Sequence, residues 1–229
     1  MRPGFSGCGM KSKRPSLPSQ RNYEYAYAQA YELACKELVK VTDIEEQCRR
    51  GGAQYQEAGS QKLIILNYLN RSYRITLPEV QVSLSDSPET VPLKTRVLLL
   101  HYLIRAKGAL LSGRMITFKE LPEGGVYAPT FAKRTLNPLT VNFGKAPKRL
   151  IDAARGLGGQ KAAFGDVSVT ISAFPRVPVT LVLWQGDSEF PPSASIMFDA
   201  TVTDYLPSED IIVACEAIIW TLVRSPKTA

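Results

Sequence analysis

Residues 167–199 read VSVTISAFPRVPVTLVLWQGDSEFPPSASIMFD and are the most informative about the fold. Between 167 and 173, Val, Ile and Ala alternate with Ser and Thr, which is the period of two expected of a half-buried strand. A continuous apolar run covers 178–184, and a second one covers 194–198. The stretch therefore predicts three consecutive strands.

The sequence that follows predicts a buried helix. It begins near Pro207-Ser208, carries Glu209 and Asp210 in its first turn, where the helix dipole favours anions, and runs to Arg224. Its most apolar part, 211–223, contains Glu216 and is shorter than the roughly 20 residues that span a bilayer. We expect no membrane span and a cytoplasmic protein.

The first half of the chain has a similar order of elements. Apolar residues spaced by three and four predict one helix from Asn22 to about Arg50, ended by Gly51-Gly52. Three strands are predicted next, followed by a helix from Pro92 to Lys107. The predicted strands cover 62–69, 72–77 and 80–84.

The middle of the chain predicts a strand at 115–119, a loop through Gly124-Gly125, and two short helices. These helices cover about 130–143 and 147–157. The whole is an α+β fold of mainly antiparallel sheet covered by helices. The order helix, three strands and helix is predicted twice, at 22–107 and at 147–224. This repetition is consistent with an internal duplication or with an ordinary α+β domain.

The predicted domain organisation is a flexible basic tail at 1–21 and a single domain at 22–229, with 22–110 and 145–226 as its two halves if it is duplicated. The net charge of +7 comes from 28 bases and 21 acids. Residues 1–22 hold five bases and no acid, which leaves 23 − 21 = +2 for the rest. A nearly neutral body argues against nucleic acid as the partner.

The four cysteines, at 8, 35, 48 and 215, have no metal-binding spacing, so no protein-held metal cluster is expected.

Three segments are similar to those of a known family: WQGDSEFPPSASIMFD at 184–199, DYLPSEDI at 204–211 and LLLHYLIRAKGALLSGRMITFKELPEGGVY at 98–127. With FPRVP at 174–178, they resemble domain-of-unknown-function family 3786. The resemblance implies an uncharacterised protein of anaerobes, some of whose relatives look like fusions to an iron-sulfur domain.

Acidic residues near strand ends are the first candidate site. Asp187, Glu189 and Asp199 could act as acid and base or hold a divalent cation. In the alternative interpretation these acids have structural roles alone. Asp187 in Gly-Asp-Ser then holds a turn, and Ser208, Glu209 and Asp210 cap a helix.

His101, the sole histidine, lies among leucines on a predicted helix. Such a histidine is often a core residue bonded to backbone or Tyr. Its functional alternative is to serve as the axial ligand of a haem or corrinoid, which needs only one protein imidazole.

Aromatic and basic residues provide the other candidate binding groups. Bases gather in the middle segment beside Gly124-Gly125, which suits an anion. Two prolines hold Arg176, for which an ion pair with Asp187 or Asp199 is expected. We expect the walls of a single cofactor pocket to be built, with His101, from six residues: Tyr127, Arg134, Arg176, Trp184, Phe190 and Tyr205.

The leading functional hypothesis is a module of anaerobic metabolism that binds a small anionic or metal-containing cofactor between sheet and helices. The alternatives are an enzyme that uses Asp187, Glu189 and Asp199, and a scaffold that binds a protein partner and no small ligand.

Overall fold

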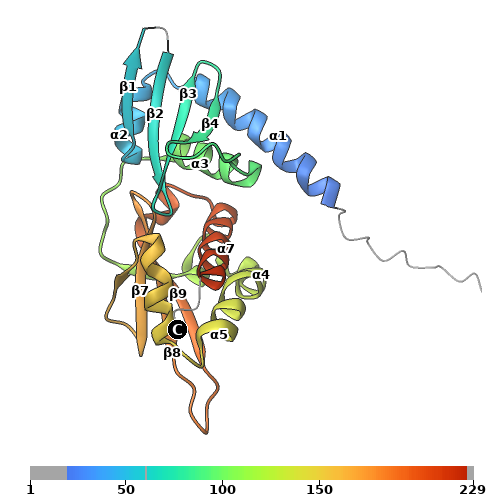
Figure 1. The fold of residues 1–229 in the computed structure, drawn as a ribbon, viewed down its shortest axis with the longest axis vertical. Helices are drawn as coiled ribbons and strands as arrows, with labels where there is room; N and C mark the ends of the chain where they lie inside the picture. The colour runs from blue at the N-terminus through green and yellow to red at the C-terminus, as the bar shows by residue number, and fades with distance from the viewer. Residues whose placement is uncertain (1–19, 60, 226–229) are drawn as a thin grey trace, which may run out of the picture.

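The computed structural model describes residues 20–59 and 61–225. Two antiparallel sheets lie one beyond the other along the long axis of the molecule, and helices flank each of them (Figure 1). The predicted α+β class is confirmed. Residues 1–19 of the predicted basic tail lie outside the described residues, whereas Gln20 and Arg21 belong to the first helix.

The first predicted helix is two helices, α1 (Gln20–Val39) and α2 (Ile44–Gly51). The break has a local cause, because the Asp43 side chain accepts a hydrogen bond from Glu46 N at 2.9 Å and starts a new helix. Gly52 ends α2 in the left-handed conformation (φ 66°), as the Gly-Gly pair predicted.

The first sheet has four strands in the order β1-β2-β3-β4, one more than predicted. They are β1 (Gln54–Ala58), β2 (Gln61–Tyr68), β3 (Arg71–Leu77) and β4 (Gln81–Leu84). The missed strand, QYQEA, is an edge strand without apolar alternation, so its pairing with β2 is not visible in the sequence. Alternate residues of β2 and β3, among them Ile64 and Ile75, form the buried face.

The second long helix, α3 (Leu93–Arg105), follows this sheet, and a connection then leads to β5 (Met115–Thr117) and η1 (Phe118–Glu120). The predicted loop at Gly124-Gly125 is instead the start of α4 (Gly124–Phe131). The π-helical η2 (Ala132–Leu136) and α5 (Asn137–Phe143) continue it. Gly124 is required here because a Cβ would lie 2.0 Å from the carbonyl oxygen of Phe118.

The second sheet has the order β5-β9-β8-β7-β6, preceded by α6 (Lys148–Ala154) and η3 (Arg155–Leu157). Its strands besides β5 are β6 (Gln160–Lys161), β7 (Val167–Phe174), β8 (Val177–Trp184) and β9 (Ser193–Asp199). Then come η4 (Ala200–Asp204) and α7 (Ser208–Arg224), which matches the predicted last helix.

The two halves repeat one order: a helix, a four-stranded meander and a helix. The repeat has a constant spacing of 106 residues, which separates Gly52 from Gly158 and Gly59 from Gly165. All four glycines have positive φ. The first residues of β7 and β2 also differ by 167 − 61 = 106, and those of β8 and β3 by 177 − 71 = 106. A bulge at Ser172/Phe174 shifts the pairing of β7 by one residue.

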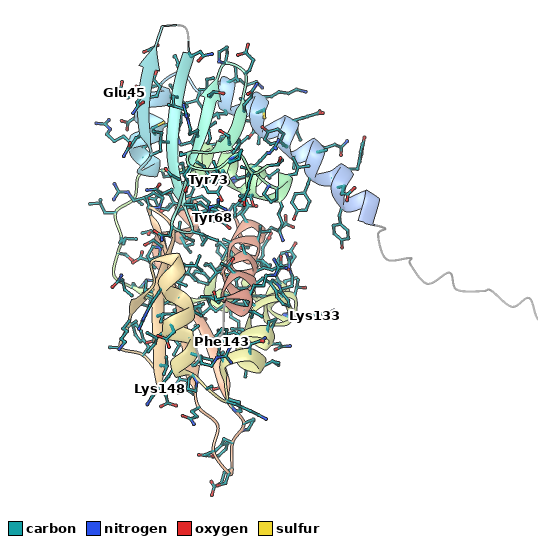
Figure 2. The ribbon with its side chains drawn as sticks, viewed as in Figure 1. Glu45, Tyr68, Tyr73, Lys133, Phe143 and Lys148 are labelled. Carbon is teal, nitrogen blue, oxygen red and sulfur yellow. The ribbon has the colours of Figure 1, made fainter. Side chains whose placement is uncertain are left out.

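Aromatic rings join the halves where the two sheets meet. Tyr68 and Phe174, which are equivalent in the repeat, have ring centroids 4.7 Å apart, and Phe174 stacks on Tyr102 at 4.0 Å. Tyr68 lies at the level between the two sheets in Figure 2. The Leu69 amide donates to the Ala173 carbonyl at 3.0 Å, so hydrogen bonding also crosses this junction.

Candidate functional site

A cavity of about 360 Å³ lies where helices of both halves meet. Three residues of the predicted cofactor pocket, His101, Tyr127 and Arg134, line it together. Its other lining residues are Tyr27, Ala30, Val97, Thr130, Glu209, Asp210, Ile212 and Val213. The walls therefore come from α1, α3, α4, η2 and α7, and the sheets contribute none of them.

The cavity is centred on the pair formed by α3 and α7. Lys94 pairs with Glu216 and His101 pairs with Asp210, so the two helices run in opposite directions. This register places Val97 of α3 opposite Val213 of α7, and both line the cavity. Clefts between two structural units are frequent places for ligand sites.

His101 is held in a defined orientation by a carboxylate. Its Nδ1 lies 2.7 Å from Oδ2 of Asp210, in the first turn of α7, and the side chains are 27% and 12% exposed. In a neutral imidazole, a carboxylate at Nδ1 favours the tautomer with the proton on Nδ1 and the lone pair on Nε2. His101 thus presents Nε2 as the nitrogen available to a ligand of the cavity.

Arg134 is fixed by Glu216 of α7. Its Nε donates to Oε1 at 3.1 Å and its Nη2 donates to Oε2 at 2.6 Å, and Lys94 of α3 also pairs with Oε2. Burial raises the pKa of Glu216, but the hydrogen bonds from Arg134 and Lys94 outweigh it, and the pKa lies below its ordinary value. Glu216 is therefore an ionised link between three elements.

Two tyrosines contribute aromatic side chains to the lining of the cavity. Tyr27 of α1 and Tyr127 of α4 are both half-buried. Burial raises the pKa of Tyr27 above its ordinary value of 10.0, so its hydroxyl stays protonated at neutral pH. Together with Val97, Ile212 and Val213 they make a wall that is mainly apolar, interrupted by a few polar groups.

The other four predicted pocket residues do not line this cavity. Tyr205 is fully buried and its hydroxyl donates to the Ala109 carbonyl. Trp184 ends β8 opposite Ser193, at the far end of the sheet from the residues that precede Tyr205. Phe190 is 68% exposed in the loop after Trp184. The expectation that Trp184 and Tyr205 share one pocket is therefore wrong.

Arg176 is also elsewhere, in the turn between β7 and β8, where Pro175 packs against Gly52. The predicted ion pair of Arg176 with Asp187 or Asp199 is absent from the described residues. Both carboxylates accept hydrogen bonds from backbone amides instead, and Asp187 follows β8 at the end of that strand opposite to Arg176.

The three acids predicted to act together do not meet. Asp187 holds a turn, since its Oδ1 accepts from Glu189 N at 2.8 Å and Phe190 N at 2.7 Å, and these bonds lower its pKa. Glu189 is exposed in the same loop. Asp199 lies at the opposite end of β9, because that loop precedes Ser193 and Asp199 is the last residue of the strand.

Asp199 is buried and fully engaged by protein donors. It accepts from the amides of Ser112, Gly113 and Thr201 and from the hydroxyls of Ser112 and Thr201, at 2.7–3.1 Å. Burial raises its pKa, but the bonds from Thr201 and Ser112 prevail, and the pKa falls far below its ordinary value. Such a carboxylate orders the connection before β5 and starts η4.

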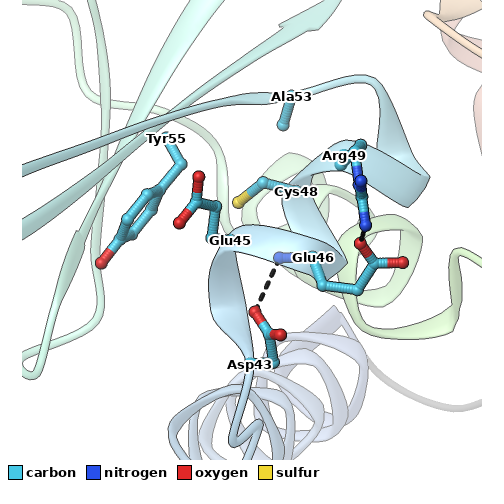
Figure 3. A pocket seen from close by; sticks show the side chains of 7 residues that line it. All are labelled: Asp43, Glu45, Glu46, Cys48, Arg49, Ala53 and Tyr55. Carbon is cyan, nitrogen blue, oxygen red and sulfur yellow. Dashed lines mark hydrogen bonds and ion pairs between the residues drawn. The ribbon is translucent and has the colours of Figure 1, made fainter.

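A second cavity, of about 390 Å³, lies between α2 and β1 (Figure 3). Asp43, Glu45 and Glu46 line it with Cys48. Asp43 caps α2 and Glu46 pairs with Arg49, while burial raises the pKa of Cys48 to about 12. Two of its three acids, Asp43 and Glu46, are thus occupied by local structure, and its thiol is not a nucleophile at neutral pH.

Bare metal ions have no ready site in the part of the chain that the structure describes. No group of three or more His, Cys, Asp or Glu side chains there could hold one. The described part of the chain also contains no helix that is long and apolar enough to cross a membrane.

These features define a protein of two similar α+β halves with a helix-lined cavity between them. A family model described as "Domain of unknown function (DUF3786)" matches residues 43–221, and the chain belongs to this family. The match includes α3 and most of α7, but not α1, which supplies Tyr27. No curated protein and no solved structure matches the chain.

The partners that orient the site residues are not evident from the sequence. Asp210 stands there as either a site acid or part of a helix cap, but α7 has no side-chain cap, and Ser208 donates to the Pro122 carbonyl instead. Glu216 was noted only as an interruption of an apolar run. A lone acid on the buried face of a helix is the signal that could have indicated an ion pair across helices.

Proposed function

We propose that the protein binds a metal-containing cofactor in the cavity between its halves, with His101 Nε2 as a ligand of the metal. The observation that carries the proposal is the 2.7 Å contact between His101 Nδ1 and Asp210 Oδ2. Histidines that bind metals usually donate their second ring N–H to a carboxylate or carbonyl, which orients the ring and makes it a better ligand.

The class of cofactor follows from what else the cavity contains. One imidazole cannot retain a bare ion, and no cluster of ligands accompanies it among the described residues. A metal that is already held in a planar macrocycle needs only an axial ligand from the protein. The apolar and tyrosine walls suit the faces of such a ring, so a tetrapyrrole fits these residues better than a free ion.

The test is a titration of the purified protein, under anaerobic conditions, with iron protoporphyrin and with cobinamide, followed by absorption spectroscopy. We expect a saturable shift with one of them that is lost in His101→Ala. Phe190→Ala is the matched control, because Phe190 is exposed and outside the cavity. A flat titration with both compounds, or an unchanged shift in His101→Ala, would overturn the proposal.

The same contact favours a second candidate, an enzyme in which His101 acts as a general base oriented by Asp210. The neutral imidazole would take a proton at Nε2 while the carboxylate stabilises the imidazolium. Hydrolysis of an activated ester by the metal-free protein, lost in His101→Ala and retained in Phe190→Ala, would favour this function. Ester hydrolysis at the same rate in all three proteins would remove it.

A further inference from the structure

The guanidinium of Arg134 has a side that its internal partner does not use. Glu216 takes the Nε and Nη2 edge through its two carboxylate oxygens. Nη1, which carries two further N–H groups, has no hydrogen-bond partner among the described residues. Arg134 lines the cavity with His101, and its side chain is 33% exposed.

The local charge supports binding of an anion at this point. Lys94 and Arg134 share the single carboxylate of Glu216, which leaves one excess positive charge in the cluster. The remaining acids of the cavity, Glu209 and Asp210, lie on the first turn of α7, about two turns from Glu216, and Asp210 is paired with His101. The cavity is thus divided into an end with a metal ligand and an end with a fixed cation.

We infer that Arg134 Nη1 pairs with a carboxylate carried by the cofactor, so the bound tetrapyrrole is one with carboxylate arms, of the porphyrin type. Corrinoids carry amide arms, which can accept a hydrogen bond from Arg134 but cannot form an ion pair with it. This inference rests on the proposed function. It adds that the cofactor is a porphyrin and that Arg134 makes the cavity bind porphyrins more tightly than corrinoids.

The test compares iron protoporphyrin with its dimethyl ester, which keeps the ring and the metal but neutralises both carboxylates. We expect the wild-type protein to bind the acid about 10-fold more tightly than the ester, as one charge-assisted hydrogen bond implies. In Arg134→Gln the guanidinium is absent. The ratio of the two affinities, acid to ester, should then depend only on the difference in hydrophobicity between the two ligands. The comparison of ratios cancels effects common to both ligands.

Lys133→Gln is the matched control, because it removes the same charge from the residue before Arg134 on η2, and Lys133 is exposed and does not line the cavity. Its acid-to-ester ratio should equal that of the wild type. Arg134→Lys serves if Arg134→Gln does not fold, because Lys keeps the pair with Glu216 but has no fork to offer a second partner. It should also reduce the ratio.

The outcomes separate the two proposals. A shift that requires His101 but has the same acid-to-ester ratio in the wild type and the Arg134 variants overturns the role of Arg134 and leaves the proposed function intact. Tighter binding of cobinamide than of iron protoporphyrin would likewise contradict the porphyrin class. The absence of any shift that requires His101 removes the proposed function and this inference with it.

Discussion

His101 Nδ1 lies 2.7 Å from Asp210 Oδ2, and this contact joins the helix that follows the first sheet to the helix that follows the second. The contact places the one histidine of the chain at the junction of the two halves, where α1 and η2 complete a cavity around it. A residue that packs only as part of a leucine-rich helix would not need an acidic partner from the other half.

Asp210→Asn should weaken the binding of the cofactor that shifts the wild-type spectrum by about 10- to 100-fold, as substitutions of carboxylates behind metal-binding histidines do. An amide at this position accepts a weaker bond from Nδ1–H and no longer polarises the ring. Titration by absorption spectroscopy measures the change. The control is Asp204→Asn, which removes an acid paired with Lys107 outside the cavity, and equal loss of binding in both variants would contradict the prediction.

Glu216→Gln should lower the free energy of unfolding by about 1–3 kcal/mol, because it leaves Arg134 and Lys94 with a neutral acceptor in a half-buried cluster. Urea denaturation followed by circular dichroism checks it. Glu89→Gln is the comparison, since the Arg71–Glu89 pair is well exposed and should contribute less than about 1 kcal/mol. A cost no greater than that of Glu89→Gln would show that the Glu216 cluster does not stabilise the fold.

Asp199→Asn should destabilise the protein by about 2–3 kcal/mol at pH 7, because an amide cannot accept all of the bonds that the carboxylate accepts. The pKa of Asp199 is depressed in the folded protein, so its stabilisation is full above the unfolded value, near 3.9, and is lost as the pH falls towards the lower folded value. The difference between wild type and variant should therefore shrink below about pH 4. Denaturation midpoints between pH 7 and pH 3 test this, and Glu189→Gln should leave stability unchanged throughout.

Gly52→Ala should cost more than Gly59→Ala, although both glycines have nearly the same left-handed conformation, with φ of 66° and 62°. Each substitution carries the backbone cost of about 1–2 kcal/mol for a side chain with positive φ. At Gly52 the new Cβ would in addition lie 2.8 Å from Cβ of Pro175, whereas nothing lies within 4 Å at Gly59. Thermal unfolding of the two variants measures the difference. Equal melting temperatures would show that Pro175 can move away from the new Cβ with no loss of stability.

Local patterning accounts for most of the elements that the sequence predicts. The strands at 167–198 and the helix that ends at Arg224 come from strong periodicities and clear end signals, and the structure has them within a few residues. β1 was missed and the first helix was predicted as one because a polar edge strand and a capping Asp43 leave little trace in hydrophobic spacing.

An α+β chain with repeated helix and strand order can be predicted from the sequence, because periodicity is a property of neighbouring residues. Residue type also indicates His101, Tyr127 and Arg134. Their sharing of a cavity, from which Arg176, Trp184, Phe190 and Tyr205 are absent, depends on how α3 packs against α7 and is seen only in the folded protein. The same packing brings Asp210 to His101 and Glu216 to Arg134, across more than 80 residues of chain in each case. Contacts at that separation follow from the docking of the two halves, which no local pattern encodes.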